Sequence, residues 1–119
     1  DGTYRSMMGV APADMVEPLL EAGADILGSN CGNGSAGMVT IVREIRTVDP
    51  AVPILVHANA GMPLYENGHT LFPETPAIMA SHVEALLEAG VNILGGCCGT
   101  SPEHIKAIKE IINVKNTPK

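Results

Sequence analysis

The feature that most restricts the fold is a repeated segment. Residues 19–32 and 86–99 align without gaps and are identical at ten of fourteen positions, with Cys31 falling on Cys98. Each copy is typical of a helix end, a glycine turn, a short apolar strand and then a cysteine. Strands separated by helices run parallel, so their carboxyl ends lie on one rim. The repeat therefore predicts an α/β fold that brings Cys31, Cys97 and Cys98 together.

The rest of the chain continues the alternation of helices and strands. The middle strand is apolar throughout, which suits burial on both faces, and residues 59–74 show no clear period and indicate a long loop. Loops are longer after strands than before them. Helices are predicted at residues 12–22, 36–48, 75–89 and from 101 onwards, strands at 25–29, 53–58 and 92–96, and a frayed tail at 114–119.

The predicted sheet is too small to be a complete fold. Three parallel strands do not close a barrel, and an open sheet of this size leaves exposed edges. Longer loops after strands are typical of (β/α) barrels and doubly wound sheets, whose sites lie at the carboxyl ends of the strands. We therefore expect residues 1–119 to be the C-terminal portion of a (β/α)8 TIM barrel, or to assemble with the missing part. The start at Asp1, without an initiator Met, suggests an excised piece.

Composition argues against several partners. The net charge is −6 with seven Lys and Arg, and one Phe, two Tyr and no Trp leave little surface for base stacking. Nucleic acid is therefore not expected as a partner. No apolar run approaches the ~20 residues of a membrane span, and no export signal opens the chain. We expect a cytoplasmic, reducing location, in which the three cysteines stay unpaired.

Three thiols at one rim suggest a metal site. Zinc favours a tetrahedral shell of thiolates, and a catalytic site leaves one position open. The glycines around Cys97 and Cys98 let the backbone leave strand geometry, so both sulfurs can turn toward one centre. A shell of three thiolates suits the activation of an incoming thiol for alkyl transfer. Core filling, a vicinal redox disulfide and a nucleophilic cysteine remain alternatives.

Polar residues near the strand ends are further candidates. Asn59 ends the middle strand and is predicted to be catalytic, by holding the substrate or occupying zinc's fourth position; a simple turn role is the alternative. His57 shares its face and is either a ligand or an interior histidine with its hydrogen bonds satisfied. His82 and His104 fall on predicted helices and are expected to be surface or packing residues.

Several motifs resemble one known family. The segments Gly28–Gly34, Asn59–Pro63, Pro73–Pro76 and Gly95–Ile105 resemble, in order and at suitable spacing, the homocysteine S-methyltransferase family, most closely its cobalamin-dependent branch. The resemblance implies a (β/α)8 barrel in which this chain supplies strands six to eight. It also implies that Cys31, Cys97 and Cys98 bind Zn²⁺.

The resemblance implies a reaction as well. The intact enzyme would activate homocysteine as a zinc thiolate and methylate it to methionine. Methylcobalamin on a corrinoid domain or protein would be the donor, with betaine or S-methylmethionine as alternatives. The early strands, which carry most contacts to homocysteine in the family, are absent from this chain, so we expect the fragment alone to be a poor enzyme. A non-catalytic zinc-binding or interaction module and a self-associating half-barrel are the rival interpretations.

Overall fold

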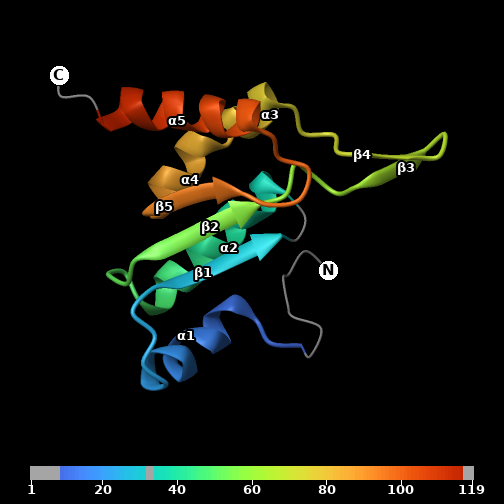
Figure 1. Cartoon of the computed structure of the whole chain (residues 1–119). Coiled ribbons are helices and arrows are strands. Elements are labelled where there is room, and N and C mark those ends of the chain that lie inside the picture. Colours follow the sequence, from blue (N-terminus) through green and yellow to red (C-terminus); the bar gives the residue numbers. More distant parts are fainter. Residues whose placement is uncertain (1–8, 32–33, 117–119) are drawn as a thin grey trace.

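The chain folds around a three-stranded parallel sheet, one face of which is covered by helices (Figure 1). The computed structural model describes residues 9–31 and 34–116. The strands are β1 (Leu27–Cys31), β2 (Ile54–Ala58) and β5 (Ile93–Gly96), in the spatial order β1-β2-β5. Both pairings are parallel. The predicted α/β class is confirmed, and the middle strand of the sequence is also the middle strand of the sheet.

In the described part of the chain, five helices precede, connect and follow these strands. Proline at the start of α1 and Thr75, whose side chain accepts from the Ile78 amide, mark two helix beginnings. Gly90 ends α4 with φ of 113°, a left-handed conformation that favours glycine. Among the described residues, no helix combines the length and apolar composition that a membrane crossing needs. The helices are α1 (Pro12–Glu21), α2 (Ser35–Val48), α3 (Pro76–Ser81), α4 (Val83–Ala89) and α5 (Pro102–Asn116).

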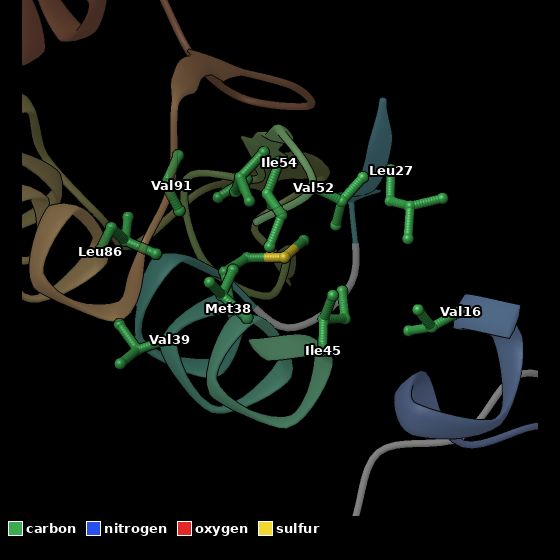
Figure 2. Close-up of a cluster of buried hydrophobic side chains, with 12 residues drawn as sticks. Val16, Leu27, Met38, Val39, Ile45, Val52, Ile54, Leu86 and Val91 are labelled. Carbon is green, nitrogen blue, oxygen red and sulfur yellow. The ribbon is translucent and has the colours of Figure 1, made fainter. Parts of the chain in front are cut away.

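The main core lies between the sheet and α2 (Figure 2). Val42 and Ile45 of α2 are fully buried, as are Ile54 and Val56 of β2. The faces of β2 alternate, because Leu55 and His57 between these residues are only half-buried. The prediction that this strand is buried on both faces is therefore wrong for this chain. The opposite face of the sheet is partly open, and it exposes Ile93 of β5 by 43%.

The segment predicted to be a long loop contains a β-hairpin. Strands β3 (Leu64–Glu66) and β4 (His69–Leu71) pair antiparallel and extend away from the sheet (Figure 1). Asn67 and Gly68 form the turn with φ of 51° and 79°. Asn-Gly is the dipeptide that a two-residue hairpin turn with positive φ favours. The Asn-Gly dipeptide could have predicted this hairpin. The flanking strands, however, are too short to show an alternating pattern, so the segment resembled a loop.

The predicted helix at residues 75–89 is two helices. The helix is interrupted at His82, whose side chain bonds Ser35 of α2. Ile78 is 44% exposed, whereas Met79 is buried in a second cluster with Ala60 and Ile108. Packing of α3 against α5 sets this orientation. Helix α5 extends to Asn116, and residues 117–119 of the predicted tail lie outside the described residues.

Candidate metal centre

The register of the sheet brings the cysteine-bearing strand ends to one level. Cys31, the last residue of β1, pairs with Ala58 at the end of β2, and Ala58 pairs with Gly96 at the end of β5. Cys97 and Cys98 follow Gly96 directly. The backbone therefore places the three cysteines on the same rim, as the repeat predicts. The side chain of Cys31 lies outside what the structure describes, so its role as a ligand stays a prediction.

Hydrogen bonds hold the Cys97–Cys98 turn against the end of β2. The Cys97 amide donates to the Ala58 carbonyl over 2.8 Å, and the Cys98 carbonyl accepts from the Ala60 amide over 2.9 Å. Thr100 closes the turn, since its hydroxyl donates to the Cys97 carbonyl over 2.7 Å. Gly99 follows with φ of 81°. This anchoring takes the pair out of strand geometry, as the flanking glycines predicted.

The two sulfurs of the turn suit a shared metal ion. Cys97 Sγ and Cys98 Sγ lie 4.0 Å apart. Tetrahedral zinc, with Zn–S distances of about 2.3 Å, holds its sulfurs about 3.8 Å apart. Cys97 is half-buried and Cys98 is exposed, so both thiols are accessible to an ion. The pair therefore fits two positions of a zinc shell.

A third ligand is needed to complete such a shell. In the described part of the chain, His, Cys, Asp and Glu side chains form no group of three or more that could hold a metal ion. The Cys31 side chain is not included in that part. Zinc binding and the complete set Cys31, Cys97 and Cys98 accordingly stay predictions, supported here by the backbone rim and by the spacing of one sulfur pair.

The Asn59 side chain contacts the backbone of the Cys97–Cys98 turn. Its side chain is buried, and its Oδ1 accepts a hydrogen bond from the Cys98 amide over 3.0 Å. An amide oxygen that holds the backbone of a ligand sets the direction in which that ligand's side chain leaves the chain. The predicted catalytic role of Asn59 stays a prediction. The contact with Cys98 adds a positioning role that the sequence did not indicate.

His57 lies on the open face of the sheet, next to β5. A Cβ at Gly95, its partner in the register, would be 2.7 Å from His57 Cδ2. The ring thus occupies the space that glycine leaves on the neighbouring strand. A larger residue at position 95 would collide with the His57 ring, which explains why glycine is found there. The interpretation of His57 as a metal ligand stays a prediction.

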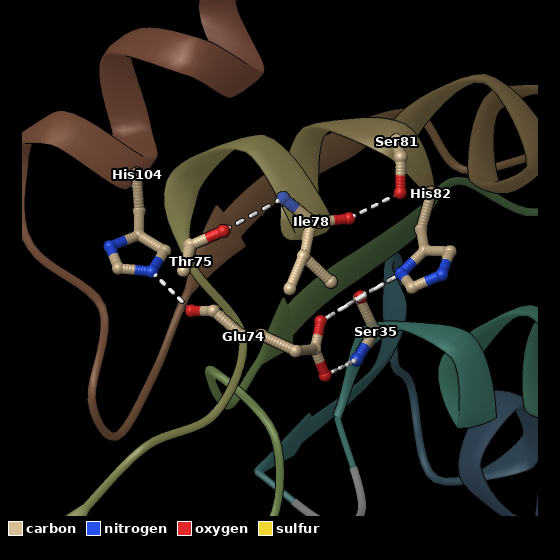
Figure 3. Close-up of polar contacts among 7 residues, drawn as sticks. All are labelled: Ser35, Glu74, Thr75, Ile78, Ser81, His82 and His104. Atoms are coloured by element: carbon tan, nitrogen blue, oxygen red, sulfur yellow. Dashed lines mark hydrogen bonds and ion pairs between the residues drawn. The ribbon is translucent and has the colours of Figure 1, made fainter.

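Sequence reasoning overlooked a polar cluster beside this rim (Figure 3). Glu74 accepts from both the backbone amide and the hydroxyl of the buried Ser35, and that hydroxyl also contacts His82 Nδ1 over 2.6 Å. His104 is buried as well, and its Nε2 lies 2.7 Å from the Glu74 carbonyl oxygen. The expectation of surface or packing roles for both histidines missed these bonds. Residues from four separate segments meet there, so local pattern could not have revealed them.

A parallel sheet with cysteines at the carboxyl ends of its strands defines an α/β protein, and similarity to known proteins identifies its family. The profile of the family described as homocysteine S-methyltransferase matches residues 1–112. The chain belongs to this family, as its motifs predicted.

Individual relatives agree with that assignment. The chain is 36% identical over 104 residues to a methionine synthase of Mycobacterium leprae and 34% identical over 102 residues to one of Mycobacterium tuberculosis; these matches cover 87% and 84% of the chain. The homocysteine methyltransferase MmuM from Escherichia coli, in its oxidised form, superimposes with a TM-score of 0.62 and 26% identity over 86% of the chain. The chain spans only 8% of each methionine synthase and 30% of the MmuM chain.

Proposed function

We propose that this chain is the zinc-binding portion of an enzyme that methylates homocysteine to methionine. The observation that carries the proposal is the rim itself, where the ends of β1 and β5 stand level and Cys97 Sγ lies 4.0 Å from Cys98 Sγ. Cys31, Cys97 and Cys98 are the proposed ligands. Family membership supports the reaction class, since the family is described as homocysteine S-methyltransferase.

The open sheet supports a larger barrel around this chain. Parallel sheets occur almost only with both faces covered. Here Gly28 and Ile93 are exposed on the face opposite α2. We infer that further strands of a (β/α)8 barrel, in which β1, β2 and β5 are the sixth to eighth, would pair with the edges and enclose this face. Contacts to the amino and carboxylate groups of homocysteine would then come from those strands.

The residues of the rim have separate tasks in this proposal. A zinc ion in a three-thiolate shell would accept the sulfur of homocysteine and lower the pKa of that thiol. Asn59 holds the Cys98 backbone, and the Ala58 and Ala60 backbone bonds fix the direction of the turn. Burial of Asn59 keeps water away from the hydrogen bond that it accepts.

The relatives and the motifs together support a proposal for the methyl donor. Both mycobacterial relatives are methionine synthases many times longer than this chain. We propose methylcobalamin on a separate corrinoid domain or protein as the donor, in keeping with the cobalamin-dependent branch that the motifs resemble. A reducing location such as the cytoplasm would keep the three thiols available for zinc.

Metal content of cysteine variants tests the proposal. In the full-length protein that contains this chain, we expect wild type to bind one equivalent of zinc by atomic absorption, and Cys97→Ser to lose it. Met62→Ser is the matched control, because it removes an exposed sulfur side chain from the segment that follows β2. Full zinc retention by Cys97→Ser would contradict the assignment.

A homocysteine methylation assay separates the enzyme from its rival. The rival is a zinc-binding module without catalysis, which the short span of the chain relative to its relatives makes a real alternative. Turnover with a methylcobalamin donor supports the enzyme. Stoichiometric zinc without turnover, in protein that includes the whole barrel, supports the module.

A further inference from the structure

The double-cysteine turn and the start of α2 are joined by a continuous chain of hydrogen bonds. The Cys98 carbonyl accepts from the Ala60 amide over 2.9 Å, and the Ala60 carbonyl accepts from the Glu74 amide, also over 2.9 Å. The Glu74 carboxylate then accepts from the backbone amide of Ser35 over 3.2 Å and from its hydroxyl. Ser35 is the first residue of α2 and lies four residues after Cys31.

The hydroxyl of Ser35 has one proton, and its partners determine where it points. A carboxylate only accepts, so the Ser35 hydroxyl donates to Glu74 Oε1. The Ser35 hydroxyl oxygen therefore accepts from His82 Nδ1–H over 2.6 Å. Ser35 is fully buried, and no buried polar side-chain atom of the described residues lacks a partner. Glu74 and His82 thus hold the first turn of α2 between them (Figure 3).

His104, in the first turn of α5, holds the backbone of Glu74 in place. His104 Nδ1 accepts from the Ser101 amide over 3.1 Å, so the proton of the ring is on Nε2. That Nε2–H donates to the Glu74 carbonyl oxygen over 2.7 Å. His104 belongs to the first turn of α5, which follows the Cys97–Cys98 turn. Its bond ties the exit of that turn to the same residue that holds α2.

Gly34, which precedes α2, is packed closely against Glu74 and Gly61. Gly34, which precedes Ser35, has φ of 105°, and a Cβ there would overlap Glu74 Oε2. The same Cβ would be 3.1 Å from the Cα of Gly61, just beyond β2. Gly34 and the start of α2 therefore have little room to shift unless Glu74 shifts with them.

We propose that Glu74 is a positioning residue for the proposed metal centre, setting the start of α2, four residues after Cys31, relative to the Cys97–Cys98 turn. The inference rests on the proposed zinc-binding function. A tetrahedral ion needs its third sulfur placed against the other two, and two of those sulfurs come from a segment far from Cys31 in sequence. Glu74 bonds Ser35, which follows Cys31 in the sequence, and it also bonds Ala60, which in turn bonds Cys98. Residues that orient metal ligands typically change affinity by about 10- to 100-fold when they are mutated.

The zinc affinity of Glu74→Gln, measured by competition with a chromogenic chelator in the full-length protein, tests the proposal. Glutamine has the same shape but puts an amide donor against the donors of Ser35. We expect affinity to fall about 10- to 100-fold in the wild-type background. Glu84→Gln is the matched control, because it removes an exposed carboxylate bonded to Lys115 on the surface, and it should change affinity less than twofold.

A second background separates positioning from general support of the fold. In Cys31→Ser protein the ligand that Glu74 positions is gone, so Glu74→Gln should then cause no further loss. Coupled residues show such non-additivity, and independent ones do not. An equal loss in both backgrounds would overturn the proposal, as would affinity within twofold of wild type for Glu74→Gln.

A variant that fails to fold would not block the test. Should circular dichroism show Glu74→Gln unfolded, Ser35→Ala takes its place, with an expected fall of about 3- to 10-fold, the effect of one hydrogen bond, again only when Cys31 is present. Absence of cysteine-dependent zinc in wild type would overturn the proposed function itself. Normal zinc in wild type with an unaffected Glu74→Gln and Ser35→Ala would overturn only the role of Glu74.

Discussion

Asn59 and Cys98 are joined by a hydrogen bond of 3.0 Å, in which the buried amide oxygen of Asn59 accepts from the Cys98 backbone N–H. The contact links the end of the middle strand to the only pair of adjacent cysteines in the sequence. It stabilises a backbone that has left strand geometry and that carries two proposed zinc ligands.

Removing the Asn59 acceptor should loosen the cysteine turn. In Asn59→Ala the Cys98 amide loses this partner, and we expect zinc affinity to fall about 10- to 100-fold and the free energy of unfolding to fall by about 1–3 kcal/mol. Asn59→Asp keeps an oxygen in the same place and should restore most of the affinity. Chelator competition and urea unfolding measure the two effects. Equal zinc affinity for Asn59→Ala and wild type would refute the positioning role.

Two glycines of the sheet should differ in their tolerance of alanine. A Cβ at Gly28 would be 2.6 Å from the Leu55 carbonyl oxygen, which is fixed in the neighbouring strand. A Cβ at Gly95 would meet the His57 ring at 2.7 Å, and that side chain can rotate away. We expect Gly28→Ala to lower the free energy of unfolding by about 1–3 kcal/mol and Gly95→Ala by clearly less. Urea denaturation of both variants checks the order, and the reverse order would be inconsistent with this packing.

Asp49 should contribute to stability in a pH-dependent way. Its Oδ1 accepts from the Ala51 amide over 2.8 Å and the Val52 amide over 3.0 Å. These bonds, chiefly that from Ala51, lower the pKa of the Asp49 carboxyl below its ordinary 3.8. A pKa that is lower in the folded chain adds stability above the unfolded value, and this stability is lost as pH falls through the folded value.

The comparison of wild type with Asp49→Asn tests that dependence. Asparagine can accept the same hydrogen bonds but does not titrate. Between about pH 6 and pH 3, we expect wild type to lose more free energy of unfolding than Asp49→Asn. Thermal unfolding at a series of pH values provides the measurement. If the free energy of unfolding fell equally with pH in the two proteins, Asp49 would not contribute to the loss of stability in acid.

Much of the fold could be predicted because its signals are local. Apolar periodicity and glycine turns located the strands and most helices, and the repeat ending in Cys31 and Cys98 implied a common rim. The Asn67–Gly68 hairpin was also encoded locally, but its strands are too short to show a period. The break at His82 was not, and at that position the side chain bonds Ser35, which lies 47 residues away in the sequence.

The sequence by itself determined the α/β class, the parallel order of the strands and the cysteine rim, because each depends on patterns within about fifteen residues. Tertiary structure alone decided which side chains hold that rim together. Glu74 meets Ser35, Ala60 and His104 from three distant segments, and Asn59 meets Cys98 from another strand. Hydrogen bonds between such segments depend on register and packing, and these are set only when the whole sheet and its helices assemble.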